Sequence, residues 1–192
     1  EIYKKPIVDV TNVDRQLGKL VNHSGNYGAG PRVLQTHAHK YGVDNVTYDV
    51  SKFLLEARHR AIPGLKEWWK DVERQLTRTR TIVTCLGRKR IFFGRLDQGT
   101  FRDAYAFEPQ STIGDVTNIG LVRLEKLLPS EAFIVLQVHD EIVVSCLEGQ
   151  QFEVAESMKK AFVIPLFINE SPILIPLDIS VGNNWRDGEV IL

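Results

Sequence analysis

The stretch VLQVHDEIVV, residues 135–144, places two acids and a histidine in the middle of a segment that is otherwise typical of a β-sheet. A carboxylate that is buried without a partner costs several kcal/mol, so a plain strand has no reason to carry Asp140 and Glu141 here. We therefore expect two strands, residues 132–139 and 141–147, on either side of a His-Asp-Glu turn. This turn is the first candidate functional site.

Adjacent carboxylates at this turn have two explanations. The first is an acidic surface turn without a function, since β-turns favour aspartate. The second is a divalent metal site, because Mg²⁺ prefers carboxylate oxygens and offsets the repulsion between neighbouring acids. Mg²⁺ usually binds one or two carboxylates plus substrate phosphates, so Asp140 would be half of a site that substrate and another acid complete. A zinc site is not expected, because no His or Cys lies at ligand spacing beside these acids.

A second candidate site lies in RQLGKLVNHSGNYG, where Arg15, Lys19, His23 and Tyr27 recur every four residues. Four residues turn a helix by about 400°, so these side chains follow one slowly drifting face with steps of roughly 6 Å. Two cations about one turn apart match a polyphosphate, and the two rings beyond them could pack on a sugar and a base. The alternative is a solvated basic stripe.

The chain as a whole reads as helices first and then strands packed with helices, which predicts an α+β fold in two lobes. Gly and Pro separate the first elements at NYGAGP, at Gly42 and at Pro63. We expect helices over 13–24, 31–42, 51–61 and onward to about 79, a β-hairpin over TIVTCLGRKRIFF (81–93), a helix over about 100–128, the strand pair, an amphipathic helix after Gly149, and a final strand ILIPLDISV (173–181).

The formal net charge is zero, but the charge is unevenly distributed. Between Arg58 and Arg95 there are eleven Lys or Arg and three acids, which gives 11 − 3 = +8 for this segment. A cationic surface on a neutral chain can hold a polyanion locally, although a solvated helix face is the plainer interpretation. Cys85 and Cys146 are expected to be reduced, buried thiols in two apolar strands, rather than a disulfide or a metal site. No apolar run approaches the roughly 18 residues of a membrane span, and no signal-peptide core is visible at the N-terminus.

The spacing R-x3-K-x7-YG at residues 15–28, followed far downstream by VHDE (138–141), resembles motifs B and C of the family A DNA polymerases, the bacterial polymerase I and phage replicative type. HDE rather than HDS separates these enzymes from the related single-subunit RNA polymerases. The resemblance covers about residues 13–185 in the right order, and the ordered set is far more specific than any one motif. Further matching segments are IPG (62–64, family YPG), TCLGRKR (84–90, a hairpin with G-R-R), Arg102-x3-Ala106-x3-Gln110 (R-x3-N-x3-Q) and VGNNW (181–185, V-G-x-N-W).

The resemblance implies a role for each matching residue. Arg15 and Lys19 would hold the dNTP triphosphate, with Lys19 also the proton donor to the leaving pyrophosphate. His23 and Tyr27 would complete the dNTP site, and Asp140 and Glu141 would form the catalytic metal site, with Glu141 in support. The residues expected to contact primer or template DNA are Gly28, Arg102, Gln110 and His139.

Three departures from the family pattern carry consequences. His23 stands where the family has Phe or Tyr, which puts sugar discrimination in question, and Ala106 replaces an Asn. Motif A, D-x-S-x-x-E-x-R, which supplies the other metal-binding aspartate, should precede residue 13. The similar stretch DVSKFLLEAR (49–58) has two extra residues and lies on the wrong side of motif B, so we interpret it as a helix that begins at Asp49 or Ser51.

These observations lead to a prediction for the chain as a whole. We expect a helical fingers portion with motif B over residues 1–80, and part of a palm, an antiparallel sheet with packed helices and motif C, over residues 81–192. The predicted function is template-directed addition of dNTPs to a primer 3′ end by two-metal (Mg²⁺) phosphoryl transfer. The expected partners are primer-template DNA, dNTPs and a second polypeptide, or missing segment, that carries motif A and the thumb.

Two alternatives remain open from the sequence. The chain is either one part of a naturally split polymerase or the C-terminal piece of a longer one. The expected location is the cytoplasm of a bacterial or phage-infected cell, and no membrane partner is expected. The rival function is a non-catalytic DNA-binding or scaffolding subunit of a replication complex.

Overall fold

The computed structural model describes residues 6–191 and confirms the α+β class. The chain forms two compact units, and each is described here by itself. The first unit takes in the described residues up to Ile82 together with Lys89–Glu108. The second takes in Val83–Arg88 and the described residues from Pro109 onward.

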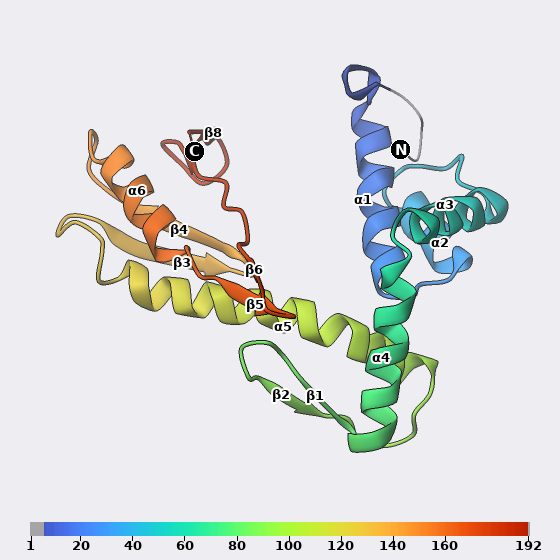
Figure 1. The fold of residues 1–192 in the computed structure, drawn as a ribbon. Helices are drawn as coiled ribbons and strands as arrows, with labels where there is room; N and C mark the ends of the chain where they lie inside the picture. Colours follow the sequence, from blue (N-terminus) through green and yellow to red (C-terminus); the bar gives the residue numbers. More distant parts are fainter. Residues whose placement is uncertain (1–5, 192) are drawn as a thin grey trace. The chain divides into compact units, whose positions relative to one another are not determined.

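The first unit begins with three helices that pack on one another: α1 (Asn12–Asn26), α2 (Pro31–Lys40) and α3 (Tyr48–Ala61). A short 3₁₀ turn, Ile7–Asp9, precedes them, and Figure 1 shows the three helices side by side. Their apolar faces share one core: α1 and α2 each place two buried aliphatic residues four positions apart, and α3 adds two adjacent leucines. The buried members of this core are Leu17, Val21, Leu34, Ala38, Val43, Val46, Leu54 and Leu55.

Threonine side chains cap the N-termini of two of these helices. Thr11 caps α1 with a reciprocal box, in which its hydroxyl accepts from the Asp14 amide and the Asp14 carboxylate accepts from the Thr11 amide. The prediction that DVSKFLLEAR is helical is confirmed. However, the predicted start at Asp49 or Ser51 is wrong, because Thr47 is the cap and accepts from the Val50 amide at 3.3 Å.

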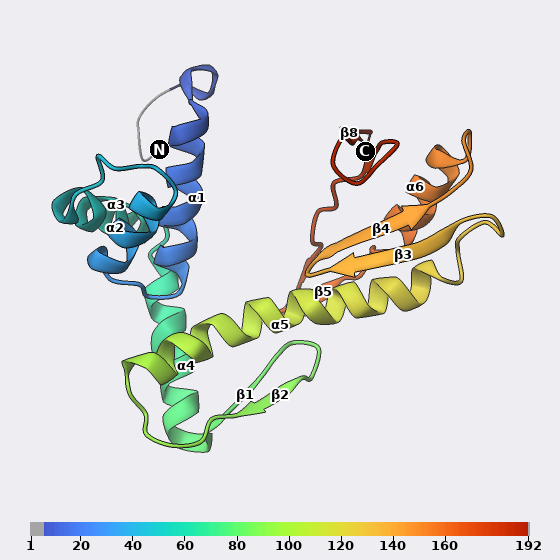
Figure 2. The same ribbon diagram turned by 180° about the vertical axis from the view of Figure 1, so that it is seen from behind.

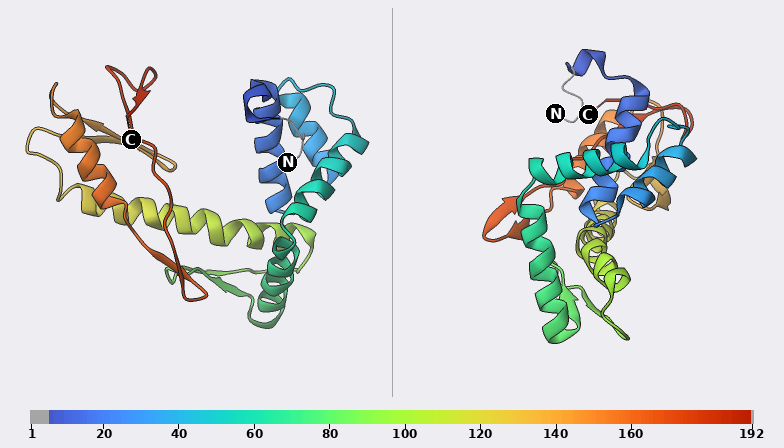
Figure 3. Two further views of the ribbon diagram at one scale, coloured as in Figure 1. Left: turned by 45° about the horizontal axis from the view of Figure 1, so that its top comes forward. Right: turned by 90° about the vertical axis from the view of Figure 1, so that its right-hand side faces the viewer.

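The helix α4 (Gly64–Thr79) follows α3 closely and leads to a hairpin of β1 (Thr81–Val83) and β2 (Lys89–Ile91), as Figure 3 shows. A second core of the first unit gathers here around the start of α5 (Gln98–Leu124). It is rich in aromatic rings, which bury large areas in few residues. Its buried members are Val72, Leu76, Ile82, Phe92, Ala104 and Tyr105, with Tyr27, Trp68, Trp69, Leu96, Phe101 and Phe107 packed against them.

The second unit continues α5 and adds small antiparallel sheets. The hairpin of β3 (Phe133–Val138) and β4 (Glu141–Ser145) is followed by α6 (Gln151–Ala161), which lies beside it (Figure 2). Two further strand pairs complete the unit: β5 (Leu166–Ile168) with β6 (Ser171–Ile173), and β7 (Ser180–Val181) with β8 (Glu189–Val190).

Two predictions about the second unit are wrong. The run ILIPLDISV is not one strand, because only its first residue and its last two lie in strands. Pro176, which has no amide hydrogen, stands in the middle of the interruption. The cysteines are not buried in strands either: Cys85 is exposed in the β1–β2 turn and Cys146 is half-buried just after β4. Both are free thiols, as expected.

No helix among the described residues is long and apolar enough to cross a membrane.

The end of α6 packs against α5 at a glycine. The Phe162 ring, which follows α6, occupies the space that a side chain at Gly120 would need, and an added Cβ would lie 2.2 Å from Phe162 Cε1. Phe162 also packs on the core of Val116, Ile164 and Leu166. The ring therefore depends on the absence of a side chain at position 120.

We predict that Gly120→Ala lowers the free energy of unfolding by about 1–3 kcal/mol, because the added methyl forces the ring or the helix to shift. Gly114→Ala is the matched control: it lies on the same helix, and nothing lies within 4 Å of its added Cβ. It should be neutral or stabilise by about 0.5–1 kcal/mol through helix propensity. Urea unfolding of both variants measures the difference, and equal midpoints would contradict the packing described.

Candidate functional site

The helix α1 carries the four residues predicted to bind dNTP. Arg15, Lys19 and His23 are exposed, whereas Tyr27 is half-buried at the end of the helix. The rings of His23 and Tyr27 meet edge to face with centroids 5.0 Å apart, so they share one face of the helix. The opposite side, with Leu17 and Val21, is buried in the core.

Gly28 ends α1 in a conformation that suits glycine. Its φ is +69°, and the amide of Ala29 closes the turn on the carbonyl of Ser24 at 2.9 Å. A Cβ at position 28 would lie 3.5 Å from the Tyr105 ring and 3.9 Å from Arg102 Cγ. The structure thus brings together Gly28 and Arg102, two of the residues predicted to contact DNA.

The predicted R-x3-N-x3-Q positions lie on α5. Arg102 and Gln110 are exposed, and Ala106 is half-buried between them. Eight residues make slightly more than two helical turns, so both polar side chains project from neighbouring sides of the helix. Ala106 adds no polar group between them.

The β3–β4 turn presents the predicted metal-binding residues. Val138 pairs with Glu141, so His139 and Asp140 form a two-residue turn. His139 has a φ of 57°, a left-handed conformation that costs a non-glycine residue on the order of 1–3 kcal/mol, and Gln137 Nε2 donates to its carbonyl at 3.3 Å. All three of His139, Asp140 and Glu141 are exposed, so the burial cost expected for the two acids does not arise.

The carboxylate of Glu141 has a partner that the sequence did not suggest. The indole Nε1 of Trp185 donates to Glu141 Oε1. Trp185 lies in the loop between β7 and β8, where Asn184 Oδ1 accepts from the amides of Arg186 (2.9 Å) and Asp187 (3.1 Å). The VGNNW segment therefore forms a tight loop whose tryptophan reaches the motif C hairpin.

The carboxylate oxygens of this hairpin are the type of ligand that Mg²⁺ prefers, but they are too few to complete its coordination. Asp140 offers an exposed carboxylate, and Glu141 keeps one oxygen apart from its bond to Trp185. Across residues 6–191 no group of three or more His, Cys, Asp or Glu side chains could hold a metal. The hairpin can supply one or two of the six ligands that Mg²⁺ requires, and substrate phosphates and a further acid would supply others.

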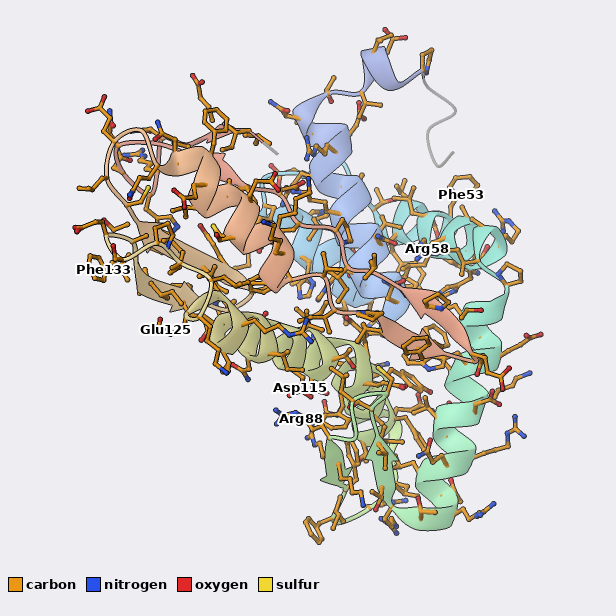
Figure 4. All side chains as sticks on the ribbon, turned by 60° about the vertical axis from the view of Figure 1, so that its left-hand side comes forward. Phe53, Arg58, Arg88, Asp115, Glu125 and Phe133 are labelled. Carbon is orange, nitrogen blue, oxygen red and sulfur yellow. The ribbon has the colours of Figure 1, made fainter. Side chains whose placement is uncertain are left out.

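An ion pair anchors the β1–β2 turn within the second unit. Arg88 Nε donates to both carboxylate oxygens of Asp115 at 2.9 Å, and its Nη2 donates to Oδ1 (Figure 4). Such forked geometry is specific to arginine. Sequence reasoning placed Arg88 in a matching hairpin motif but missed its partner, because nothing local links residues 88 and 115.

Comparison with known proteins identifies the family. The model of DNA polymerase family A matches residues 1–187, and the chain belongs to this family. It is 27% identical to DNA polymerase I of Aquifex aeolicus over 92% of this chain and 31% of that protein. It is 29% identical to the thermostable DNA polymerase I of Thermus filiformis over 91% of this chain and 21% of that protein. The chain thus spans a third or less of these relatives.

A solved structure shares the fold. The POL domain of Pol1 from M. smegmatis, in complex with DNA primer-template and dNTP, superimposes with a TM-score of 0.74 at 22% identity. The match covers 89% of this chain and 30% of that chain. The predicted resemblance to the fingers and palm region of family A polymerases is thereby confirmed.

The bond between Trp185 and Glu141 predicts a change in one indole signal. In ¹⁵N-labelled protein the three tryptophans give three indole N–H resonances. We expect Glu141→Gln to shift the Trp185 resonance alone, because the charged acceptor becomes a neutral amide. Glu148→Gln, which replaces another exposed acid of the second unit, is the control. Three unmoved resonances in Glu141→Gln would show that the bond does not form.

Proposed function

We propose that this chain provides the motif B and motif C portions of a template-directed DNA polymerase that adds dNTPs to a primer 3′ end. The observation that carries the proposal is that one family A chain contains both sites. The first is a cationic α1 face that ends in Tyr27–Gly28, and the second is an exposed Asp140 on a strained turn. The fingers portion is assigned to residues 1–80 and the palm portion to residues 81–192.

The exposed cations of α1 suit a triphosphate. Arg15 and Lys19 lie one turn apart on a helix whose other side is buried, so their charges are directed away from the core. In the proposed reaction both hold phosphate oxygens, and Lys19 gives a proton to the leaving pyrophosphate. His23 and Tyr27, in edge contact, form the neighbouring surface for sugar and base.

The motif C hairpin would hold the metal ions. Two Mg²⁺ ions, when bound, would stabilise the attacking and leaving oxygens of an in-line displacement. Asp140 is assigned as a ligand because its carboxylate is exposed at the tip of the turn. Glu141 supports the site through its second oxygen, while Trp185 occupies the first.

Exposed basic residues support DNA as a partner. On α4 the cations recur every four residues along one exposed face. Arg74 and Arg78 also line a hollow with Gln75, Thr79 and Asp71, and Asp71 forms an ion pair with Arg74. One turn of helix per cation matches a row of backbone phosphates. These four cations of α4 are Lys66, Lys70, Arg74 and Arg78.

We assign four further residues to primer or template contacts: Gly28, Arg102, Gln110 and His139.

A scaffolding subunit without catalysis is the second candidate function. It would use the cations of α4 equally well. It would not need an exposed aspartate on a turn that holds His139 at positive φ, because that conformation costs stability. This favours the enzyme.

The motif A aspartate would come from a second polypeptide or from a further segment of a longer chain. Phe133, Val135 and Leu136 of β3 are exposed, and the described residues pair β3 with β4 alone. Figure 4 shows Phe133 on this sheet. Exposed apolar strands with free edges seek partners. We propose that a neighbouring palm strand with the second aspartate covers them, in an interface above roughly 2,000 Å².

We predict that Asp140→Ala in the assembled polymerase lowers kcat by several orders of magnitude while DNA binding stays within about twofold. Removal of a metal ligand loses stabilisation of transition-state charge worth several kcal/mol. Glu141→Ala should lose less, and Glu148→Ala should resemble the unchanged protein. Steady-state primer extension and fluorescence anisotropy measure the two quantities. Near-normal extension by Asp140→Ala would remove this residue from the active site.

We predict that this 192-residue chain alone does not extend a primer, and that a chain with motif A and a thumb restores Mg²⁺-dependent extension. Asp140 and Glu141 of one turn cannot clamp two ions about 3.5–4 Å apart. The experiment mixes the purified chains, with Asp140→Ala as the control against contaminating polymerase. Robust extension by the chain alone would contradict the need for a partner.

A further inference from the structure

The last two turns of α1 are bound by an arginine from α3. Arg58 Nε donates to Asn22 Oδ1 at 2.6 Å, and Arg58 Nη2 donates to Asn26 Oδ1 at 2.7 Å. Asn22 and Asn26 are four residues apart and so share one face of the helix. A single planar guanidinium therefore bridges one full turn immediately before Tyr27.

The final carbonyls of α1 are also held by side chains. Helices leave their last four carbonyls without partners inside the helix. Trp69 of α4 donates its indole N–H to the carbonyl of Asn26 at 3.0 Å, and His59 Nε2 lies 3.2 Å from the carbonyl of Gly25 as a donor. Gly25 itself fits closely against α3, since an added Cβ would lie 3.1 Å from Arg58 Cγ.

The indole that makes this bond is fixed in its turn by other rings. Trp69 stacks on Tyr105 with centroids 5.3 Å apart and planes inclined by 19°, and His59 meets its edge at 5.2 Å. The Tyr105 hydroxyl donates to Glu73, and burial together with this acceptor raises the pKa of Tyr105, so the phenol remains a donor. Tyr105 also contacts the Gly28 side of the same helix end.

The two halves of α1 thus differ in how their exposed faces are contacted by other helices. Arg15 and Lys19 are exposed on the first half, whereas the last turn is contacted by α3, α4 and α5. We infer that Arg58 and Trp69 are positioning residues that set the orientation of Tyr27 toward the dNTP and of Gly28 toward the DNA, and so contribute to the choice of the correct dNTP. This inference rests on the proposed polymerase function.

Conservative replacements separate positioning from packing. Arg58→Lys keeps the charge, but one ammonium replaces a planar fork and cannot reproduce the geometry that serves both asparagines. Trp69→Phe keeps an aromatic ring on Tyr105 and removes only the indole N–H and some area. Two neighbours provide controls: Trp68, whose ring lies 6.1 Å from the same Tyr105, and Arg60, which is exposed and 4.0 Å from Glu56.

The first measurement does not depend on activity. Amide hydrogen exchange of residues 25–29 in this chain should become about tenfold faster in Arg58→Lys and Trp69→Phe, while exchange in α2 stays unchanged. Trp68→Phe and Arg60→Lys should leave residues 25–29 as they are. Unchanged exchange in both test variants, or an equal rise in the controls, overturns the inference at the level of structure.

The second measurement concerns selection of the dNTP by the assembled polymerase. The ratio of kcat/KM for the matched over a mismatched dNTP should fall about tenfold in Arg58→Lys and Trp69→Phe and remain unchanged in the two controls. A ratio that stays the same while exchange rises overturns the role in selection. If the assembled polymerase fails to extend primers even with the unchanged chain, the proposed function is refuted instead, and the exchange result then stands separately.

Discussion

The hydrogen bond from the Trp69 indole to the carbonyl of Asn26 is the contact on which the end of α1 depends. A helix end that packs against other elements needs donors for its last carbonyls. The donor is effective because Tyr105 and His59 fix the indole ring on two sides. Tyr105 is a buried member of the second core of the first unit, and Trp69 and Tyr27 pack against that core, so the placement of Tyr27 and the stability of that unit share one set of contacts.

The second unit places its functional groups in another way. The His139–Asp140 turn is exposed, and its geometry comes from the β3–β4 backbone pairing, from the Gln137 side chain and, through Glu141, from the loop around Trp185. None of these contacts buries a charge. An exposed carboxylate at the tip of a turn is accessible to solvent, which suits a group that exchanges water for a hard cation.

Local patterns predicted most of the elements, since periodicity, caps and glycine turns act within a few residues. The helices around Arg15–Tyr27 and the strands around the His139–Asp140 turn agree with the structure to within about two residues. The failures concern exact boundaries and exposure. Thr47 caps α3 rather than Asp49 or Ser51, the break in the last predicted strand contains Pro176, which has no amide hydrogen, and Cys85 is exposed because it lies in the β1–β2 turn.

Long-range partners could not be read from the sequence in the same way. Arg58 with Asn26, Arg88 with Asp115, and Glu141 with Trp185 join residues that are 27 or more positions apart, and no periodicity links them. Asn22 and Asn26 do share a helical face, and that repeat was a usable signal for a polar partner. The identity of the partner still required the packing of α3 on α1.

The contact between Gly120 and Phe162 has a consequence for the evolution of the chain. Because the ring occupies the place of a Cβ, the two positions cannot vary independently. A relative with a larger residue at position 120 needs a smaller one at position 162, or a displaced α6. Sequence variation at these two sites should therefore be correlated, and a homologue that breaks the correlation should differ in the path of the chain after α6.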